Sequence, residues 1–215
     1  MGIVATNYDC ERPIIFKSSN IQAHGLSKSF EIGFGCTIAD AVVCSCSAYP
    51  FFEKRIVCTK NQGNPTVIDG GFVANNPTLF AICDATMAFG KSIQELEILS
   101  VGVGNYPVPK RKGLLALLNK FEIAELPEKI FRSSSTTVDI LRTILYPTLK
   151  IVRIDESFSD KKHEISFVEA DIEKVKKLSV LGRESFRKSE RQIIDMFGIQ
   201  SHLPSGCEAE SAAEK

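Results

Sequence analysis

The sequence predicts an α/β fold in which helices cover a parallel sheet, and three observations lead to this class. First, the apolar stretch Pro65–Ile68 leads into Asp69 and two glycines, a pattern typical of a buried strand that ends in a loop. Second, an apolar stripe over residues 79–87 indicates a helix, and another apolar strand follows at Leu96–Gly102. Strand, helix and strand in succession indicate a parallel pair joined by a crossover helix. Third, residues 113–146 hold amphipathic segments with the spacing of helices that cover a sheet face.

Composition and charge limit the classes of function. The chain has 215 residues, of which 44% are hydrophobic and 24% are charged, as in a globular domain with a sizeable core. The formal net charge of zero argues against nucleic acid as the main partner. No run of about 18 apolar residues predicts a membrane-spanning helix, and residues 1–8 lack the pattern of a secretory signal. We therefore expect a cytoplasmic location, with transient contact at a membrane surface as the alternative.

The cysteines and histidines predict neither a metal site nor a catalytic triad. The seven cysteines are odd in number and form no C-x-x-C pair, which predicts buried free thiols in a reducing compartment. Cys44 and Cys46 lie close together, but no histidine is near enough in sequence to complete a zinc site. His24, His163 and His202 are scattered, and none lies in the arrangement of a Ser-His-Asp triad. We therefore expect no metal and no cofactor.

The first part of the chain predicts a hairpin followed by a buried helix. Ile3–Thr6 and Pro13–Phe16 are short apolar strands joined by a charged turn. Thr37 and Asp40 have the spacing of a helix-capping box, in which each side chain takes up a free N–H. The helix that they start is apolar nearly all round, so we expect it to be buried. Pro50 prevents its continuation.

Two aromatic residues and two short strands follow this helix. Phe51 and Phe52 are either core anchors or, with Pro50, the lining of an apolar pocket. Arg55–Cys58 and Pro65–Ile68 predict two strands joined by a polar loop.

The stretch from Asp69 to Pro77 carries the candidate site. Asp69 lies at the end of a strand, where two glycines leave its carboxylate open for chemistry. Asn76 has the side chain of a helix cap, and Pro77 suits the first helical position because its missing N–H would have no partner there. Asp-Gly is also an ordinary turn dipeptide, and the local pattern leaves both interpretations open. The helix should end near Gly90, and Gly102-Val103-Gly104 predicts a turn after the next strand.

The last part of the chain predicts two strands, two helices and a tail. The strands are Leu149–Asp155 and Ile165–Val168, and the helices are Asp171–Leu181 and Gly182–Phe197. Four basic residues predict a solvated helix face: Arg183, Arg187, Lys188 and Arg191. Residues 199–215 are rich in Ser, Glu and Ala, which predicts a disordered tail after a domain over residues 1–198.

Several segments resemble the patatin-like phospholipase family. Ala39–Phe52 is similar to the family's helix that ends in a Ser-Ala-x-Pro-x-x-Phe-type segment. Asp69–Pro77 is similar to its Asp-Gly-Gly/Ala motif with an Asn-Asn-Pro continuation. Ile98–Gly104 resembles the Ser-Leu-Gly-Thr-Gly segment that follows, with Val103 at the Thr position, and Ile3–Thr6 resembles an upstream strand. The motif residues besides the aspartate are Gly70, Gly71, Asn75, Asn76 and Pro77.

The resemblance implies both a fold and an activity. The fold is a three-layer α/β/α arrangement with a mostly parallel central sheet and helices on both faces. The activity is hydrolysis of ester bonds in phospholipids or related acyl lipids by a Ser–Asp dyad, without metal or cofactor. Asp69 would be the proton acceptor, and Gly70 and Gly71 would let the backbone pass close to the serine. The acyl chain would lie against Pro50, Phe51 and Phe52.

One family element is absent from the sequence. The family's serine lies in a G-x-S-x-G segment, and no such segment occurs in these 215 residues. The nearest match, Gly25–Ser29, ends in serine, and no glycine-rich oxyanion loop precedes it. We therefore expect the C-terminal part of a patatin-like domain, with N-terminal strands missing and open strand edges. Such a chain would be inactive without an upstream complementing segment that carries the nucleophile. The alternative is a non-catalytic remnant that acts as a binding or regulatory module.

Overall fold

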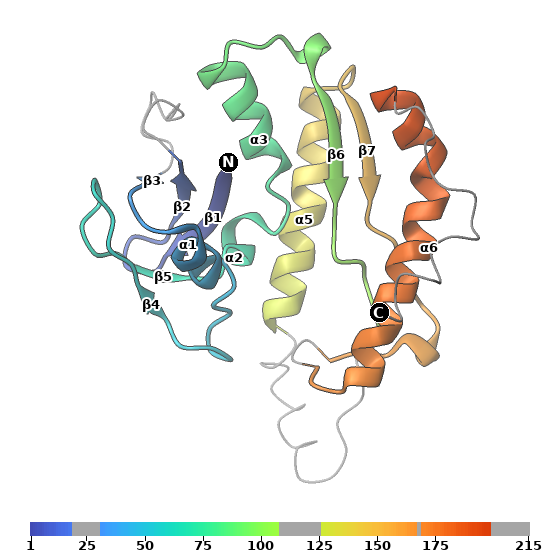
Figure 1. Cartoon of the computed structure of the whole chain (residues 1–215), viewed down its shortest axis with the longest axis horizontal. Helices are drawn as coiled ribbons and strands as arrows, with labels where there is room; N and C mark the ends of the chain where they lie inside the picture. The colour runs from blue at the N-terminus through green and yellow to red at the C-terminus, as the bar shows by residue number, and fades with distance from the viewer. Residues whose placement is uncertain (19–30, 108–125, 167–168, 199–215) are drawn as a thin grey trace, which may run out of the picture.

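The computed structural model describes residues 1–18, 31–107, 126–166 and 169–198, and Figure 1 shows the arrangement of its elements. The strands are β1 (Gly2–Asn7), β2 (Arg12–Lys17), β3 (Glu31–Gly33), β4 (Arg55–Ile56), β5 (Thr66–Ile68), β6 (Glu97–Val101) and β7 (Lys150–Ile154). The helices are α1 (Ile38–Ser45), α2 (Gly71–Ala74), α3 (Thr78–Cys83), α5 (Leu126–Leu145) and α6 (Ile172–Phe197). The α/β class predicted from the sequence is therefore confirmed.

The strands form two sheets rather than one. The larger sheet has the order β3-β2-β1-β5-β4, and β6 and β7 form a separate parallel pair. Three of the four pairings in the larger sheet are antiparallel, and only β2 and β3 run parallel. A single mostly parallel sheet is thus not what the described residues form. The cause is local, because residues 8–11 join β1 to β2 and are too few for a parallel crossover.

The core of the larger sheet lies under α1. Ala5, Ile14 and Phe16 on the sheet pack with Ala41 and Cys44 of the helix. The antiparallel register places Ala5 opposite Ile14, so these side chains share one face. Burying each large apolar side chain contributes roughly 1.5–3 kcal/mol, and this face therefore anchors α1.

Helix α1 begins as predicted but is less buried than predicted. The Thr37 side chain accepts a hydrogen bond from the Asp40 backbone N–H at 3.0 Å, which confirms the cap. The expectation of burial all round is wrong, because Ile38, Val42 and Val43 are 63%, 46% and 47% exposed. The sheet covers only one side of the helix, and no described element covers the other.

One ion pair joins the larger sheet to the end of α3. The Lys17 ammonium at the end of β2 pairs with the Asp84 carboxylate just after α3, and the Lys17 side chain is 1% exposed. The helical turns continue through residues 84–88 before Gly90 takes a positive φ of 63°, which confirms the predicted end.

The smaller sheet is packed between two long helices. Helix α5 is one continuous helix within the range 113–146, where the sequence predicted amphipathic segments, and residues 113–125 lie outside the described part. Helix α6 is likewise continuous from its Asp171 cap, so the predicted break at Gly182 is wrong. Space is open around Gly182, and the helix carries this glycine in its interior. Ile165 belongs to no strand, and part of the strand predicted there lies at residues that are not described.

Two further sequence expectations concern cysteines and the membrane. The six cysteines in the described ranges carry free thiols, but only Cys44 is buried, while Cys10, Cys46 and Cys58 are exposed. Burial raises the pKa of the Cys44 thiol to about 11.

Within residues 1–18, 31–107, 126–166 and 169–198, no helix is long and apolar enough to cross a membrane. The predicted tail at 199–215 lies outside these ranges.

Gly70 is the point where the Asp69 loop touches the larger sheet. A Cβ atom at Gly70 would lie 2.2 Å from the backbone oxygen of Val4 in β1. Its φ of −68° is ordinary, so space rather than backbone conformation requires glycine here. The predicted reason for this glycine was passage close to a serine, and contact with β1 is an additional one.

We predict opposite effects for two glycine-to-alanine substitutions. Gly70→Ala should lower the free energy of unfolding by roughly 3 kcal/mol, because the backbone of β1 must move to admit the methyl group. Gly182→Ala should raise it by about 1 kcal/mol, because alanine favours the helix and meets no neighbour. Urea unfolding of both variants measures the two changes, and equal effects would contradict this account of Gly70.

Candidate active site

The backbone around Asp69 is held from two sides. The Asp69 N–H donates to the Ser47 carbonyl oxygen at 3.0 Å, and the Gly70 N–H donates to that of Ser45 at 3.0 Å. From β1, the Thr6 hydroxyl donates to the Asp69 carbonyl oxygen at 2.8 Å. The end of α1 and the end of β1 therefore fix the position of this strand end.

The Asp69 carboxylate is half-buried and accepts one backbone hydrogen bond. Its Oδ1 atom accepts from the Gly71 N–H at 2.6 Å. Burial raises the pKa of Asp69 above its ordinary value, and the hydrogen bond from Gly71 opposes this shift. A carboxylate whose pKa is raised toward the working pH is a better proton acceptor than a fully solvated one.

A cavity of about 740 Å³ opens beside this carboxylate. Asp69 and Asn75 line one side, the turn at 102–106 lines another, and Phe131 of α5 contributes an apolar wall. The volume falls in the range of roughly 300–1,000 Å³ that small-molecule sites occupy. The cavity therefore joins the Asp69 loop to both β6 and α5.

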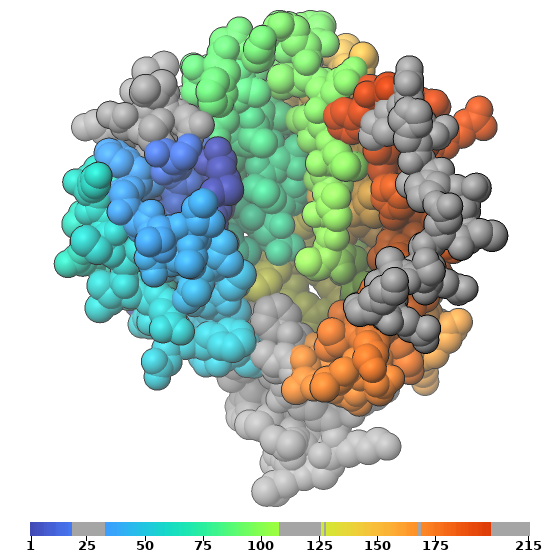
Figure 2. All heavy atoms as spheres, viewed as in Figure 1, coloured from blue at the N-terminus to red at the C-terminus, as the bar shows by residue number. Residues whose placement is uncertain are grey.

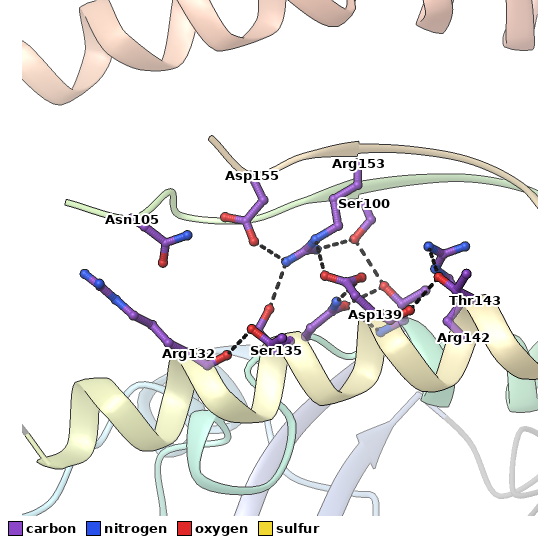
Figure 3. A network of polar contacts seen from close by, with 12 residues as sticks. Ser100, Asn105, Arg132, Ser135, Asp139, Arg142, Thr143, Arg153 and Asp155 are labelled. Carbon is purple, nitrogen blue, oxygen red and sulfur yellow. Dashed lines mark hydrogen bonds and ion pairs between the residues drawn. The ribbon is translucent and has the colours of Figure 1, made fainter. Parts of the chain in front are cut away.

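Arg153 of β7 is the centre of a polar network in the wall of this cavity (Figure 3). Its guanidinium nitrogens lie 3.1 Å from the Asp139 carboxylate of α5 and 2.5 Å from that of Asp155. It also donates to the hydroxyl of Ser100 at 2.6 Å and to that of Ser135 at 3.0 Å. The Arg153 side chain is only 17% exposed, so the two carboxylates balance the charge of a largely buried cation, although its Nε atom makes no hydrogen bond.

Asn76 links the network to the Asp69 loop. Its side-chain oxygen accepts from the Thr78 N–H at 3.2 Å and from the Thr78 hydroxyl at 2.6 Å. Asn76 thus satisfies the first N–H of α3 as a cap would, although the cap position is Pro77, one residue later than predicted. Its amide nitrogen donates to Asp139 at 3.1 Å, and the Thr78 and Ser100 hydroxyls are 3.1 Å apart. Asn76 is 1% exposed. The Asn-Asn-Pro segment thus ties the candidate base to β6, β7 and α5.

Gly102 and Gly104, which follow β6, leave room for the carboxylate of Asp155. A Cβ atom at Gly102 would lie 2.3 Å from the Asp155 carboxylate, and the Gly104 N–H donates to this carboxylate at 3.1 Å. The sequence predicted only a turn here. The structure adds a role, because the turn wraps around the partner of Arg153.

The other predicted site residues fall into two groups. Asn75 lines the cavity, and Gly71 lies directly beneath the Asp69 carboxylate. Pro50, Phe51 and Phe52, predicted to line an acyl pocket, lie in the turn after α1 and do not line this cavity; Phe52 is 54% exposed. Pro77 is exposed and directly precedes α3.

The sequence interpretation missed the Arg153 network. Its members come from three separate elements, β6, α5 and β7 with the residue that follows it, so no local motif connects them. One signal was available, because Arg153 is a long charged residue inside the apolar strand Lys150–Ile154. A cation there needs buried partners, and carboxylates on neighbouring elements are the expected ones.

Removing the Arg153 cation should destabilise the protein strongly. Arg153→Met should lower the free energy of unfolding by roughly 3 kcal/mol, because the Asp139 and Asp155 carboxylates would face each other without a counter-charge. Arg187→Met on the exposed face of α6 is the control and should change it by less than about 0.5 kcal/mol. Adding Asp155→Asn to Arg153→Met should recover part of the loss in urea unfolding. Similar losses of unfolding free energy in Arg153→Met and Arg187→Met would contradict the proposed contribution of this network to stability.

Comparison with known proteins gives one informative match. The chain is 42% identical over 193 residues to the cUMP-AMP-activated phospholipase of Escherichia coli. The match covers 90% of this chain and 60% of the relative, so the chain spans well under the full length of that protein. No protein-family model matches the chain. The similarity therefore relates nearly all of this chain to part of a phospholipase.

Proposed function

We propose that this chain is the aspartate-bearing part of a patatin-like lipid acyl hydrolase, with Asp69 as the base of a Ser–Asp dyad. The observation that carries the proposal is the half-buried Asp69 carboxylate in a cavity of about 740 Å³. The 42% identity to a phospholipase supports it. The 215 residues hold no G-x-S-x-G segment, so the serine comes from a complementing segment.

The proposed reaction assigns each proton to a named atom. Oδ1 of Asp69 is engaged by Gly71, so Oδ2 takes the proton from the serine hydroxyl. The serine oxygen then forms a bond to the ester carbonyl carbon, and the ester bond to the alcohol breaks as Asp69 returns the proton to that alcohol. A water molecule then attacks the acyl–serine ester in the same way, with Asp69 as the base, and the fatty acid is released. General base catalysis of this kind accelerates a reaction by roughly 10²–10⁴-fold.

The substrate and regulator follow from the relative as proposals. The relative is named a phospholipase that cUMP-AMP activates. We assign to the assembled form of this chain a phospholipid or related acyl-lipid substrate and activation by the same cyclic nucleotide. The apolar wall at Phe131 is the part of the cavity that suits an acyl chain. In the assembled form, the larger sheet and the β6–β7 pair belong to one three-layer α/β/α domain.

A second function is favoured by one observation. Because the nucleophile motif is absent from these residues, the chain also fits a non-catalytic binding or regulatory module. The two proposals differ in whether Asp69 is needed for ester hydrolysis once a serine-bearing segment is supplied.

We predict that Asp69→Asn abolishes hydrolysis by the assembled protein. The chain would be combined with the part of the E. coli phospholipase that the match leaves out, and phospholipid hydrolysis would be measured with and without cUMP-AMP. Asp69→Asn should lower kcat by about 10²–10⁴-fold, because an amide cannot take the serine proton. Asp160→Asn, at an exposed carboxylate that does not line the cavity, is the control and should leave kcat unchanged. Full activity in Asp69→Asn would reject the dyad and favour the non-catalytic module.

The same variant should not lose stability at neutral pH. Because the pKa of Asp69 is raised in the folded state, its ionisation becomes a stability cost as pH rises above the ordinary aspartate pKa. Asp69→Asn removes this cost, so its free energy of unfolding at pH 7 should equal or exceed that of the parent chain. The difference should disappear in acid, where Asp69 is protonated in both states. A large loss of stability at pH 7 would mean that Asp69 is structural.

A further inference from the structure

The candidate cavity contains a cation that lies outside the Arg153 network. Arg132 of α5 lines the cavity, and Figure 3 shows its side chain extending away from Arg153. Its Nη2 atom donates to the Tyr106 carbonyl oxygen at 2.8 Å and pairs with the Glu128 carboxylate one helical turn earlier. Its Nε and Nη1 atoms donate to none of the described residues. The side chain is 42% exposed, which leaves it accessible to a ligand.

The two arginines of the cavity wall differ in how far their charge is already balanced. Arg153 lies between the Asp139 and Asp155 carboxylates, so two anions share its charge. Arg132 has a single carboxylate partner, Glu128. Among the described residues of the wall, Arg132 is therefore the cation that can take a further anion.

Arg132 directly follows a residue that touches the loop of the candidate base. The Phe131 ring lies edge-on to the Phe72 ring, with centroids 5.0 Å apart, and a Cβ atom at Gly71 would lie 3.2 Å from it. In Figure 2 the yellow helix α5 is visible deep in the hollow between the blue segments around α1 and β1 and the green strand β6. Asp69 and Arg132 thus line one cavity, and a ligand can reach its α5 wall from outside.

We infer that Arg132 binds the phosphodiester of the lipid headgroup and thereby selects phospholipids over uncharged acyl esters. This inference rests on the proposed function and names the part of the substrate that the cavity recognises. The planar N–H groups of a guanidinium fit phosphate oxygens, and the hydrogen bonds are charge-assisted. In a phospholipid the phosphate is attached to the same glycerol as the ester bonds. With the ester at Asp69 and the acyl chain against Phe131, the phosphate would lie on the Arg132 side.

The charge of the wall favours a lipid headgroup over the proposed activator as the source of the phosphodiester. The described wall holds more carboxylates than cations, namely Asp69, Glu128, Asp139, Asp155 and Glu169 against Arg132 and Arg153. Lys174, which pairs with Glu169 at 2.9 Å, adds one cation from outside the wall. This negative charge opposes cUMP-AMP, which carries two phosphodiesters, more than a headgroup whose single phosphate is balanced by its own ammonium group. We therefore expect a zwitterionic headgroup.

Binding of two lipids that differ in the headgroup tests the assignment. The probes are dihexanoylphosphatidylcholine, below its micelle concentration, and dihexanoylglycerol, which has the same acyl chains but no phosphate. Titration calorimetry measures the Kd of each lipid with the 215-residue chain, so that neither hydrolysis nor a complementing segment is needed.

Three variants should give different patterns of binding. Arg132→Met should raise the Kd for the phospholipid at least about tenfold, as expected for the loss of a charge-assisted hydrogen bond, and should leave the Kd for the diacylglycerol unchanged. Glu128→Gln should lower the phospholipid Kd, because the guanidinium loses a competing carboxylate. Arg142→Met, also on α5 but outside the cavity wall, is the control and should change neither Kd.

The outcomes separate this site from the other proposals. The assignment would be overturned by the absence of phospholipid binding, by an equal rise of both Kd values in Arg132→Met, or by a higher phospholipid Kd in Glu128→Gln. The same titrations are made with cUMP-AMP, and a rise of its Kd alone in Arg132→Met would assign the residue to the activator instead. The predicted pattern of binding, together with full hydrolysis by Asp69→Asn in the assembled protein, would keep the phosphate site and reject the dyad.

Discussion

The arrangement of the molecule depends on the buried guanidinium of Arg153. It is the cation toward which the Asp139 and Asp155 carboxylates and two serine hydroxyls converge, from α5, β6 and the end of β7. Such a group is stable in a poorly solvated place only when its partners are all present, so the geometry of these elements is strongly specified. Because Asn76 also donates to Asp139, the same network reaches the loop that follows Asp69. The network thereby fixes the smaller sheet and the loop of the candidate base relative to each other.

These contacts explain how the loop that carries Asp69 is held in place. Three places hold the loop without any contribution from a nucleophile: Val4 and Thr6 of β1, Ser45 at the end of α1 with Ser47 just beyond it, and Asn76 before α3. The carboxylate meanwhile keeps one backbone donor, a raised pKa and an open cavity. The backbone of the loop therefore makes the stabilising contacts, whereas the Asp69 carboxylate is available for chemistry.

Local patterns in the sequence predicted local structure well. The Thr37 cap, the strand before Asp69, the hydrogen bond from the Thr78 N–H to Asn76 and the helix end at Gly90 all follow from short-range chemistry, and the structure contains each of them. Long-range arrangement was not predictable in the same way. Nothing local states that β5 and β6 belong to different sheets, or that Arg153 lies against carboxylates from distant segments. The apolar sequence of α1 was interpreted as burial, although Ile38, Val42 and Val43 are exposed. Apolar composition shows that a face can be buried, not that another element covers it.

The central claim is that Asp69 activates a serine that lies on another segment. A fluorophosphonate probe, which reacts with activated serines, measures this directly. We predict rapid labelling of the complementing segment when it is mixed with the parent chain, and labelling at least about 100-fold slower with Asp69→Asn, in line with the loss of a general base. Equal labelling with the parent chain, with Asp69→Asn and with no chain at all would contradict the claim, because the serine would then owe none of its reactivity to Asp69.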